Sequence, residues 1–345
     1  MASFFYFMNE NKMKGCTKEE AIARINEWAK EREPFVFIIN YAQDCSFVER
    51  ASLINAEELL YDLNGFSNMN RLSSKDFIKN EQTESVLWKV SPISYLHYKQ
   101  EFDYIRAHIL EGNSYLANLT AATPVATNVG LKELFYRSKA LYRLYLKDRF
   151  VVFSPEIFIR IQQGKICSFP MKGTIDATLP NAQQLLLNDG KEAAEHATIT
   201  DLIRNDLSCV ATHVSVERYR YIDRLQTNRG PILQTSSEVC GDLSYDYLEH
   251  LGEILFQLLP AGSITGAPKK KTMEIIAEAE DYDRGFYTGV MGYFDGKRLD
   301  SAVMIRFLEQ TERGFLFKSG GGITSQSVAE KEYEELKQKV YVPIY

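Results

Sequence analysis

The sequence predicts a large globular protein that combines helices with antiparallel strands. Its 345 residues, 45% of them hydrophobic, suffice to bury a large core in one big domain or in two closely packed ones. Two strand-like runs joined through Gln163-Gly164 indicate a hairpin. Thr17-Lys18-Glu19-Glu20 is a capping box, which predicts an amphipathic helix to about Arg32.

Composition and charge narrow the range of partners. The net charge of -6 and the pI near 5.6 give no basic surface for nucleic acid, and no apolar run of about 18 residues predicts a membrane span. The N-terminus lacks the features of a secretory signal. The cysteines are scattered, odd in number and without CxxC spacing, so neither a zinc site nor a disulfide framework is indicated. We expect a cytoplasmic protein that acts on small molecules.

The N-terminal half gives few chemical signals. Pro34 leads into a predicted strand over 35–39, and the pattern from 42 to 89 is too weak to assign chemistry, with a polar stretch over 71–84. Ser91-Pro92 predicts the start of a helix that stops at Gly112, and a strand over 114–120 follows. Asn118 is a polar residue in this apolar strand, and a hydrogen-bonded core amide is an alternative to a functional role.

The segment Phe169-Pro170-Met171-Lys172-Gly173-Thr174 holds the candidate nucleophile, Lys172. Proline and glycine favour an exit from the sheet at this point. If the hairpin register is odd and centred on Gly164, Glu156 lies opposite Lys172, with β-carbons about 5 Å apart. A slip of one residue would place the two on opposite faces. An exposed lysine at a strand end is the alternative interpretation.

Two helices each carry a pair of glutamates. The helix over 191–207 has Glu192 and Glu195, and a C-terminal helix has Glu332 and Glu335, with Lys339 one turn further along the same face. Like charges at this spacing repel, and a divalent cation between them would remove that cost. Four oxygen ligands without histidine predict Mg²⁺. Two solvated helix faces would show the same spacing.

The C-terminal half has several anion-binding candidates. A small-residue loop over 260–269 leads into a helix whose first residue is Pro268, and such an entry presents free amides to an anion. A hairpin over 289–294 and 299–308 carries Tyr293 and Arg306. Arg306 in an apolar strand needs an acidic partner or a bound carboxylate. Three glycines over 320–322 predict a loop that admits an anionic ligand, or a plain tight turn.

Together these segments resemble the chorismate-utilising family, which includes anthranilate, aminodeoxychorismate, isochorismate and salicylate synthases. The resemblance covers 91–345 and depends most on the motifs at 201–207, 262–269 and 320–323. It implies an α+β fold of two orthogonally packed antiparallel β-sheets flanked by outer helices, with the active site in the cleft between the sheets. Residues 1–90 would be a short structural region, and 91–345 the chorismate-binding catalytic region, packed as one globular unit.

The resemblance also implies roles for individual residues. The catalytic set would be Lys172, Glu156 as general acid, Asn118 and Arg204. Glu195 and Glu335 would bind Mg²⁺ directly, with Glu192 and Glu332 in support. The remaining matches would bind chorismate: Gly173, Thr174, Gln234, Thr265, Tyr293, Arg306, Gly320, Gly322 and Lys339. Arg204 fits least well, because nine residues after Glu195 a regular helix places it on the opposite face.

Lys172 determines the subtype that the resemblance implies. Aminodeoxychorismate synthases resemble this chain in having lysine before Gly-Thr; the unprotonated amine would attack C2 of chorismate, and ammonia would then add at C4. Leu116 stands where water-activating relatives have lysine, which argues against hydration. The chain shows no glutaminase motif, so a separate glutamine amidotransferase subunit would supply ammonia for 4-aminobenzoate and folate synthesis. Anthranilate synthesis and a non-catalytic chorismate-binding subunit are the alternatives.

Overall fold

The computed structural model describes residues 13–69, 85–227 and 230–344, whose strands form two nine-stranded sheets with antiparallel pairing throughout. The first sheet has, in spatial order, β11 (Met171–Asp176), β13 (Gly230–Asp242), β10 (Lys165–Ser168), β9 (Ile157–Gln162), β16 (Arg298–Val303), β15 (Val290–Phe294), β1 (Phe35–Ile39) and β2 (Ser46–Arg50), with β12 (Thr212–Thr227) also paired to β13. The second has β14 (Gly266–Ala267), β6 (Leu116–Thr127), β18 (Gly314–Ile323), β17 (Phe307–Thr311), β8 (Phe150–Ser154), β7 (Tyr142–Leu146), β3 (Leu59–Leu63) and β4 (Phe66–Ser67), with β5 (Trp88–Val90) paired to β6.

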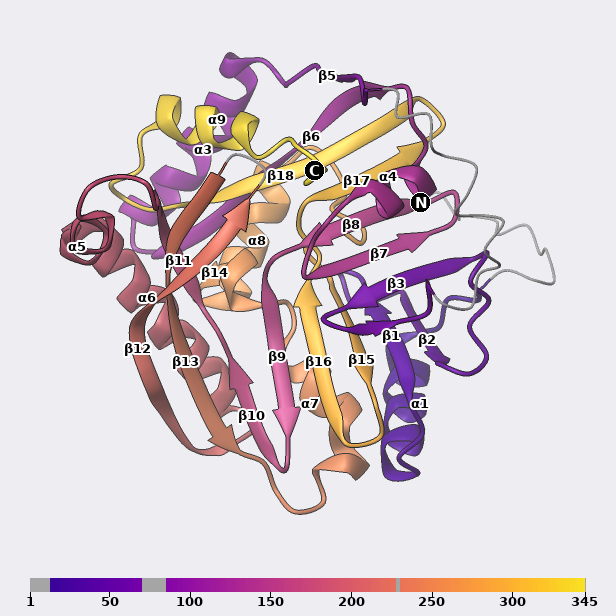
Figure 1. The fold of residues 1–345 in the computed structure, drawn as a ribbon. Helices are drawn as coiled ribbons and strands as arrows, with labels where there is room; N and C mark the ends of the chain where they lie inside the picture. The colour runs from indigo at the N-terminus through magenta and orange to yellow at the C-terminus, as the bar shows by residue number, and fades with distance from the viewer. Residues whose placement is uncertain (1–12, 70–84, 228–229, 345) are drawn as a thin grey trace.

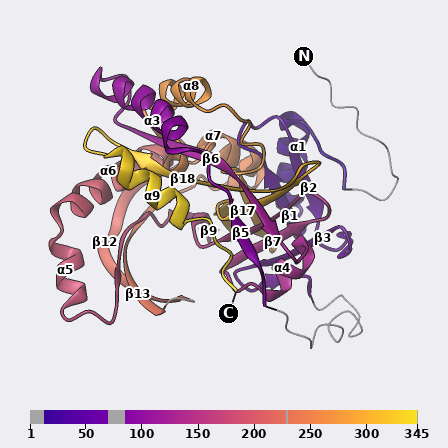
Figure 2. The ribbon, with the colours of Figure 1, turned by 90° about the horizontal axis from the view of Figure 1, so that it is seen from above.

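The strands of one sheet run across those of the other, and the helices lie on the outside (Figures 1 and 2). The helices are α1 (Lys18–Lys30), α3 (Tyr95–Leu110), α4 (Leu131–Arg137), α5 (Ala182–Asn188), α6 (Gly190–Ser208), α7 (Leu251–Leu258), α8 (Lys269–Ala279) and α9 (Ala329–Gln338). The expected α+β fold of two antiparallel sheets with flanking helices is confirmed. Among the helices of the described ranges, none is both long enough and apolar enough to span a membrane.

A tightly packed apolar layer lies between the sheets. Val36 and Ile38 of β1 meet Phe150 and Val152 of β8 and Phe307 of β17, and all five are fully buried. Burying a large apolar side chain contributes roughly 1.5–3 kcal/mol, so this layer is a major source of stability. Because β1 belongs to one sheet and β3 to the other, the N-terminal region helps to build both.

Two neighbouring short links carry the chain from one sheet to the other. β8 continues into β9 through Pro155-Glu156, and β16 continues into β17 through residues 304–306. The Val303 amide donates to the Glu156 carbonyl at 3.1 Å, and the Phe153 amide donates to the Arg306 carbonyl at 3.2 Å. The prediction of one strand over 299–308 was therefore wrong: Arg306 has a φ of 54° and lies in the link between the sheets.

The N-terminal and hairpin predictions had mixed outcomes. The Thr17 capping box is present at the start of α1. The 91–112 helix begins at Tyr95, because Ser94 and not Ser91 accepts the amide of His97. The β9–β10 hairpin pairs Gln162 with Lys165, one residue off the register that would set Glu156 opposite Lys172. That register was wrong because Gln163 and Gly164 both take positive φ and form a two-residue loop.

The predicted glycine loop at 320–322 is part of strand β18. Gly320, Gly321 and Gly322 stand opposite Thr120, Leu119 and Asn118 of β6 in a continuous ladder. A β-carbon at Gly320 would lie 2.5 Å from the Leu119 carbonyl oxygen. Glycine is required there by close packing within the sheet. The polar stretch over 71–84, to which the sequence assigned no chemistry, lies outside the described residues.

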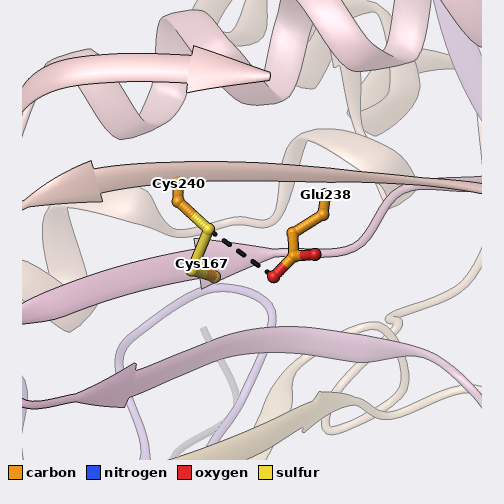
Figure 3. Close-up of side chains that lie close together, drawn as sticks. All are labelled: Cys167, Glu238 and Cys240. Atoms are coloured by element: carbon orange, nitrogen blue, oxygen red, sulfur yellow. Dashed lines mark hydrogen bonds between the residues drawn. A yellow bond between two sulfur atoms is a disulfide. The ribbon is translucent and has the colours of Figure 1, made fainter. Parts of the chain in front are cut away.

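A disulfide joins Cys167 of β10 to Cys240 of β13 (Figure 3). The two residues are direct partners across the antiparallel pair, with α-carbons 4.2 Å apart. Glu238 Oε1 lies 3.9 Å from the Cys240 sulfur. The expectation that the cysteines form no disulfide was therefore wrong, because 73 residues of sequence separation hid a contact that only the strand pairing creates.

Candidate active site

Two helices bring the predicted carboxylates together. α6 carries Glu192 and Glu195, and α9 carries Glu332 and Glu335. Burial raises the pKa of Glu332, and the negative charges of Glu335 and Glu195 raise it further. Carboxylates of both helices therefore act on one another. A β-carbon at Gly321 would lie 3.8 Å from an oxygen of Glu332 and 3.8 Å from an oxygen of Glu335, so strand β18 borders this charged group.

Three lysines pair with these carboxylates. Lys172 Nζ lies 3.5 Å from Glu195 Oε2, and Lys191 Nζ lies 3.6 Å from Glu195 Oε1. Lys339 Nζ lies 2.7 Å from Glu335 Oε1 and donates to the Gly320 carbonyl at 2.8 Å. Burial lowers the pKa of Lys339, and the positive charges of Arg306 and Lys172 lower it further. The Glu335 carboxylate raises this pKa but does not cancel the effect of burial.

The four glutamates fit a magnesium ion by their chemistry. All four donors are carboxylates, the hard oxygen ligands that Mg²⁺ prefers. Burial and the neighbouring Glu195 charge raise the pKa of Glu192, as burial and like charges do for Glu332. A divalent cation would relieve this repulsion and would compete with the lysines for Glu195 and Glu335.

Lys172 points toward these carboxylates. β11 pairs with β13, and a register shift between Lys172 and Thr174 accompanies Gly173, whose φ is 73°. The Thr235 hydroxyl donates to the Lys172 carbonyl and fixes the backbone here. A β-carbon at Gly322 would lie 3.8 Å from Lys172 Nζ, so the amine lies beside the glycine strand. The side chain is 30% exposed and is not directed into bulk solvent.

Glu156 provides a half-buried acid where the chain crosses between the sheets. The Ser263 hydroxyl donates to Glu156 Oε1 at 2.5 Å, and the Ser154 hydroxyl accepts the Glu156 amide at 3.1 Å. Burial raises the pKa of Glu156, although Ser263 and the charges of Lys172 and Arg306 favour the ionised form. The net shift favours a protonated carboxyl, which can donate a proton.

Arg306 supplies a half-buried cation near this acid. Its Nε atom is buried and has no hydrogen-bond partner among the described residues, so a ligand oxygen could satisfy it. Its guanidinium lies 5.4 Å from the centre of the Tyr341 ring. The charge of Arg306 also acts on Tyr287. A free buried donor on a cation is what a bound carboxylate requires.

The tyrosine beside Arg306 is Tyr287, not the predicted Tyr293. Burial raises the pKa of Tyr287, which is 3% exposed, while the charges of Arg284 and Arg306 lower it. The ring of Tyr293 instead stacks on Phe66 at 4.6 Å and lies 5.9 Å from that of Tyr61.

Other predicted ligands surround these groups. A β-carbon at Gly173 would lie 3.0 Å from Glu192 Oε2, so this position borders the α6 carboxylates. Thr174 and Gln234 are partners across β11 and β13. Thr265 is fully buried; its hydroxyl donates to the Ala261 carbonyl, which gives it a structural role in the loop before α8.

Asn118 lies in β6, next to the glycines of β18. Its backbone N–H donates to the Thr265 carbonyl at 3.0 Å, and its backbone carbonyl accepts from Arg284 Nη2 at 2.6 Å. The residue is 8% exposed and stands opposite Gly322. The backbone of Asn118 is therefore held rigidly next to the position that Lys172 approaches.

Arg204 does not join the site. Its guanidinium pairs with Asp201 at 2.6 Å, and both side chains are more than half exposed. α6 turns this position toward solvent, as the spacing from Glu195 predicts. Ser263, Tyr287 and Lys191 were missed by the sequence analysis. The small-residue loop over 260–269 could have pointed to Ser263, and the position of Lys191 directly before Glu192 could have pointed to Lys191.

Known proteins were compared with this chain. The family model described as "chorismate binding enzyme" matches residues 6–344. An "Uncharacterized PabA-like protein" of Haemophilus influenzae is 45% identical over 96% of this chain and 99% of its own length. The aminodeoxychorismate synthase component 1 of Klebsiella aerogenes is 32% identical, over 73% of this chain and 56% of its own length. Proteins named anthranilate synthase component 1 match at comparable identity.

The fold is also found in a solved structure. The crystal structure of anthranilate synthase component I from Streptococcus pneumoniae superposes with a TM-score of 0.63 and 24% identity, over 79% of this chain and 62% of that one. An identity this low supports the fold alone. The family model, by contrast, covers nearly the whole sequence, including both sheets and the candidate site. The chain therefore belongs to the chorismate binding enzyme family.

Proposed function

We propose that this chain makes 4-amino-4-deoxychorismate from chorismate and ammonia through a covalent adduct on Lys172. The position of the Lys172 amine supports this proposal most directly. Its Nζ lies beside Gly322, 3.5 Å from Glu195, and its charge acts on the half-buried Glu156. A nucleophile, an acid and carboxylates of the kind that bind a metal would thus be available to one substrate.

The residues divide the reaction into two balanced steps. The unprotonated Nζ of Lys172 forms a bond to C2 of chorismate, two ring double bonds shift, and the C4–oxygen bond breaks. Glu156 gives its proton to the leaving hydroxyl, which departs as water. Ammonia then attacks C4, the double bonds shift back, and the C2–nitrogen bond breaks to release the lysine. Glu156 takes the surplus proton from the new ammonium group.

Several groups would hold the substrate in place. Arg306, with its unpaired Nε, would bind the enolpyruvyl carboxylate next to Tyr287. Glu192, Glu195, Glu332 and Glu335 would hold Mg²⁺, which when bound supplies a positive charge for the ring carboxylate.

Ammonia would come from a separate glutamine amidotransferase subunit, with free ammonium as a substitute. The wording "PabA-like" and "component 1" in the names of relatives suggests proteins that work with another subunit. Elimination of pyruvate to give 4-aminobenzoate would need a further enzyme. The protein would act in the cytoplasm, as expected for folate biosynthesis.

The product decides between this proposal and anthranilate synthesis. The purified chain is incubated with chorismate, Mg²⁺ and ammonium, and aminodeoxychorismate lyase is then added. We expect 4-aminobenzoate by mass spectrometry. Anthranilate as the sole product would overturn the proposal, and unchanged chorismate would support a non-catalytic subunit.

The adduct is tested by intact-protein mass spectrometry with chorismate but without ammonium. We expect a mass increase equal to chorismate minus water in the native chain and in Lys165→Ala. Lys165 is the matched control, because it pairs with Glu217 on the exposed surface of the same sheet. Lys172→Ala should lose the adduct and the 4-amino product. An adduct that persists in Lys172→Ala would assign the chemistry to another residue.

A further inference from the structure

A second group of ligand-type side chains lies outside the active site, where α3 meets the segment after α8. His97 Nε2 lies 3.4 Å from Glu101 Oε1 and 3.2 Å from Asp281 Oδ2. One ligand atom from each residue lies within 4.8 Å of the others. His97 and Glu101 are one helical turn apart, so they share a face of α3.

Glu101 is the unusual member of this group. Its side chain is 8% exposed, and its Oε2 is buried without a hydrogen-bond partner in the part of the chain that the structure describes. An unpartnered buried carboxylate oxygen costs free energy, and a bound cation would satisfy it.

The distances in the group resemble those around a metal ion. Histidine nitrogen and carboxylate oxygen bind Zn²⁺ at about 2.0–2.2 Å, which separates neighbouring ligand atoms of a tetrahedron by roughly 3.4 Å. The two His97 contacts, at 3.4 and 3.2 Å, are close to that separation. One N–H group shared between two oxygens forms at best a three-centre hydrogen bond, in which each contact is less well aligned than in a single hydrogen bond.

We propose that His97, Glu101 and Asp281 form a binding site for a borderline divalent cation of the Zn²⁺ type. One imidazole and two carboxylates supply three ligands, and the fourth position is open to water, since His97 is 41% and Asp281 67% exposed. The nitrogen ligand distinguishes this site from the four glutamates, whose oxygen-only set suits Mg²⁺.

The site would fasten α3 to a buried network that reaches the active site. Asp281 follows Glu280, which pairs with Arg284 at 2.6 Å. Arg284 in turn donates to the Asn118 carbonyl, and Glu280 accepts the amide and the hydroxyl of Thr120. A cation on Asp281 would restrain the residue next to this network. The inference does not depend on which reaction the active site performs.

Co²⁺ serves as the probe, because its visible absorption reports coordination by nitrogen and by few ligands. The full chain is first saturated with Mg²⁺ to fill oxygen-only sites, and Co²⁺ is then titrated by absorption and isothermal calorimetry. We expect one Co²⁺ per chain, displaced by Zn²⁺. Loss of an outer-shell partner typically weakens metal binding by about 10- to 100-fold. His97→Ala and Asp281→Asn each remove a direct ligand, so they should weaken Co²⁺ binding by at least this factor.

His108→Ala is the matched control, since His108 lies on the same helix with one carboxylate, Glu111, at 3.7 Å. It should bind Co²⁺ as the native chain does. The exposed positions of His97 and Asp281 make misfolding of these variants improbable, and circular dichroism verifies it. Equal Co²⁺ binding in His97→Ala, Asp281→Asn and the native chain, or no binding in any, would overturn the proposal. Neither result bears on whether Lys172 forms an adduct.

Discussion

The two parts of the candidate site are built in different ways. On one side, Glu156 and Arg306 lie in the short links between the sheets, where backbone hydrogen bonds and buried neighbours hold them. On the other side, α6 and α9 present carboxylates that are balanced by lysines at 2.7–3.6 Å. The first side is fixed before any ligand arrives. The second side has charges that a cation can rearrange.

This difference predicts which substitutions should change the Mg²⁺ requirement of the enzyme and which should not. Changes on the fixed side should affect the chemical step with little dependence on ions, because no cation is needed to place those groups. Changes on the carboxylate side should alter the amount of Mg²⁺ that the enzyme needs. Kinetics at several Mg²⁺ concentrations therefore separate the two sides.

The largest effect is expected for Glu156→Gln. Glutamine keeps the size and can still accept the Ser263 hydroxyl, but it cannot donate a proton to the leaving hydroxyl, so the single-turnover rate should fall by about 10²–10⁴-fold. Burial raises the pKa of Glu156, and activity of the native chain should fall as pH rises through that pKa. The variant should lose this limb of the pH profile. An unchanged rate would exclude Glu156 as the acid.

Glu332→Gln tests the carboxylate side. The Mg²⁺ concentration for half-maximal activity should rise by about 10- to 100-fold, with activity largely restored at saturating Mg²⁺. Glu334→Gln is the control, because Glu334 is an exposed glutamate of the same helix that pairs with Lys337. If both variants shift the Mg²⁺ requirement equally, the glutamates of α9 do not form a specific site.

Ser263→Ala gives a smaller effect on the fixed side. The serine hydroxyl stabilises the ionised form of Glu156 and so lowers its pKa. A hydrogen bond to a charged group contributes about 1.5–3 kcal/mol. Its loss should therefore raise the pKa of Glu156 and move the descending limb of the pH–rate profile to higher pH, by about one pH unit or more. A shift to lower pH, or none, would contradict this direction.

The sequence predicted the fold class, and it named most of the residues that the structure brings together at the candidate site, because motifs fix which residues are present. The ExxE spacing placed Glu192 with Glu195 and Glu332 with Glu335 on helix faces, which a regular helix requires. Lys172 and Glu156 were likewise identified from their local sequence. Such features depend on residues near in sequence.

The errors concern contacts that depend on strand pairing. The Cys167–Cys240 disulfide, the break at Arg306 and the glycines inside β18 follow from which strands are neighbours, and sequence spacing does not show that. The nearness of Tyr287 to Arg306 also depends on how the strands pair, and the sequence analysis did not name this tyrosine. The predicted hairpin register was wrong by one residue, because the two-residue turn at Gln163-Gly164 sets the pairing of β9 with β10.

The smallest effect is expected for Arg204→Ala, which tests whether the sequence-based role of this residue holds. An exposed ion pair such as Arg204–Asp201 contributes about 0–1 kcal/mol, so the free energy of unfolding should change by no more than that. Because the guanidinium points away from the carboxylates of α6, kcat and KM should stay within about twofold of the native values. Steady-state kinetics and urea unfolding measure both quantities. A large loss of kcat with unchanged stability would mean that α6 turns Arg204 toward the substrate during the reaction, and would make the carboxylate side more mobile than its present ion pairs indicate.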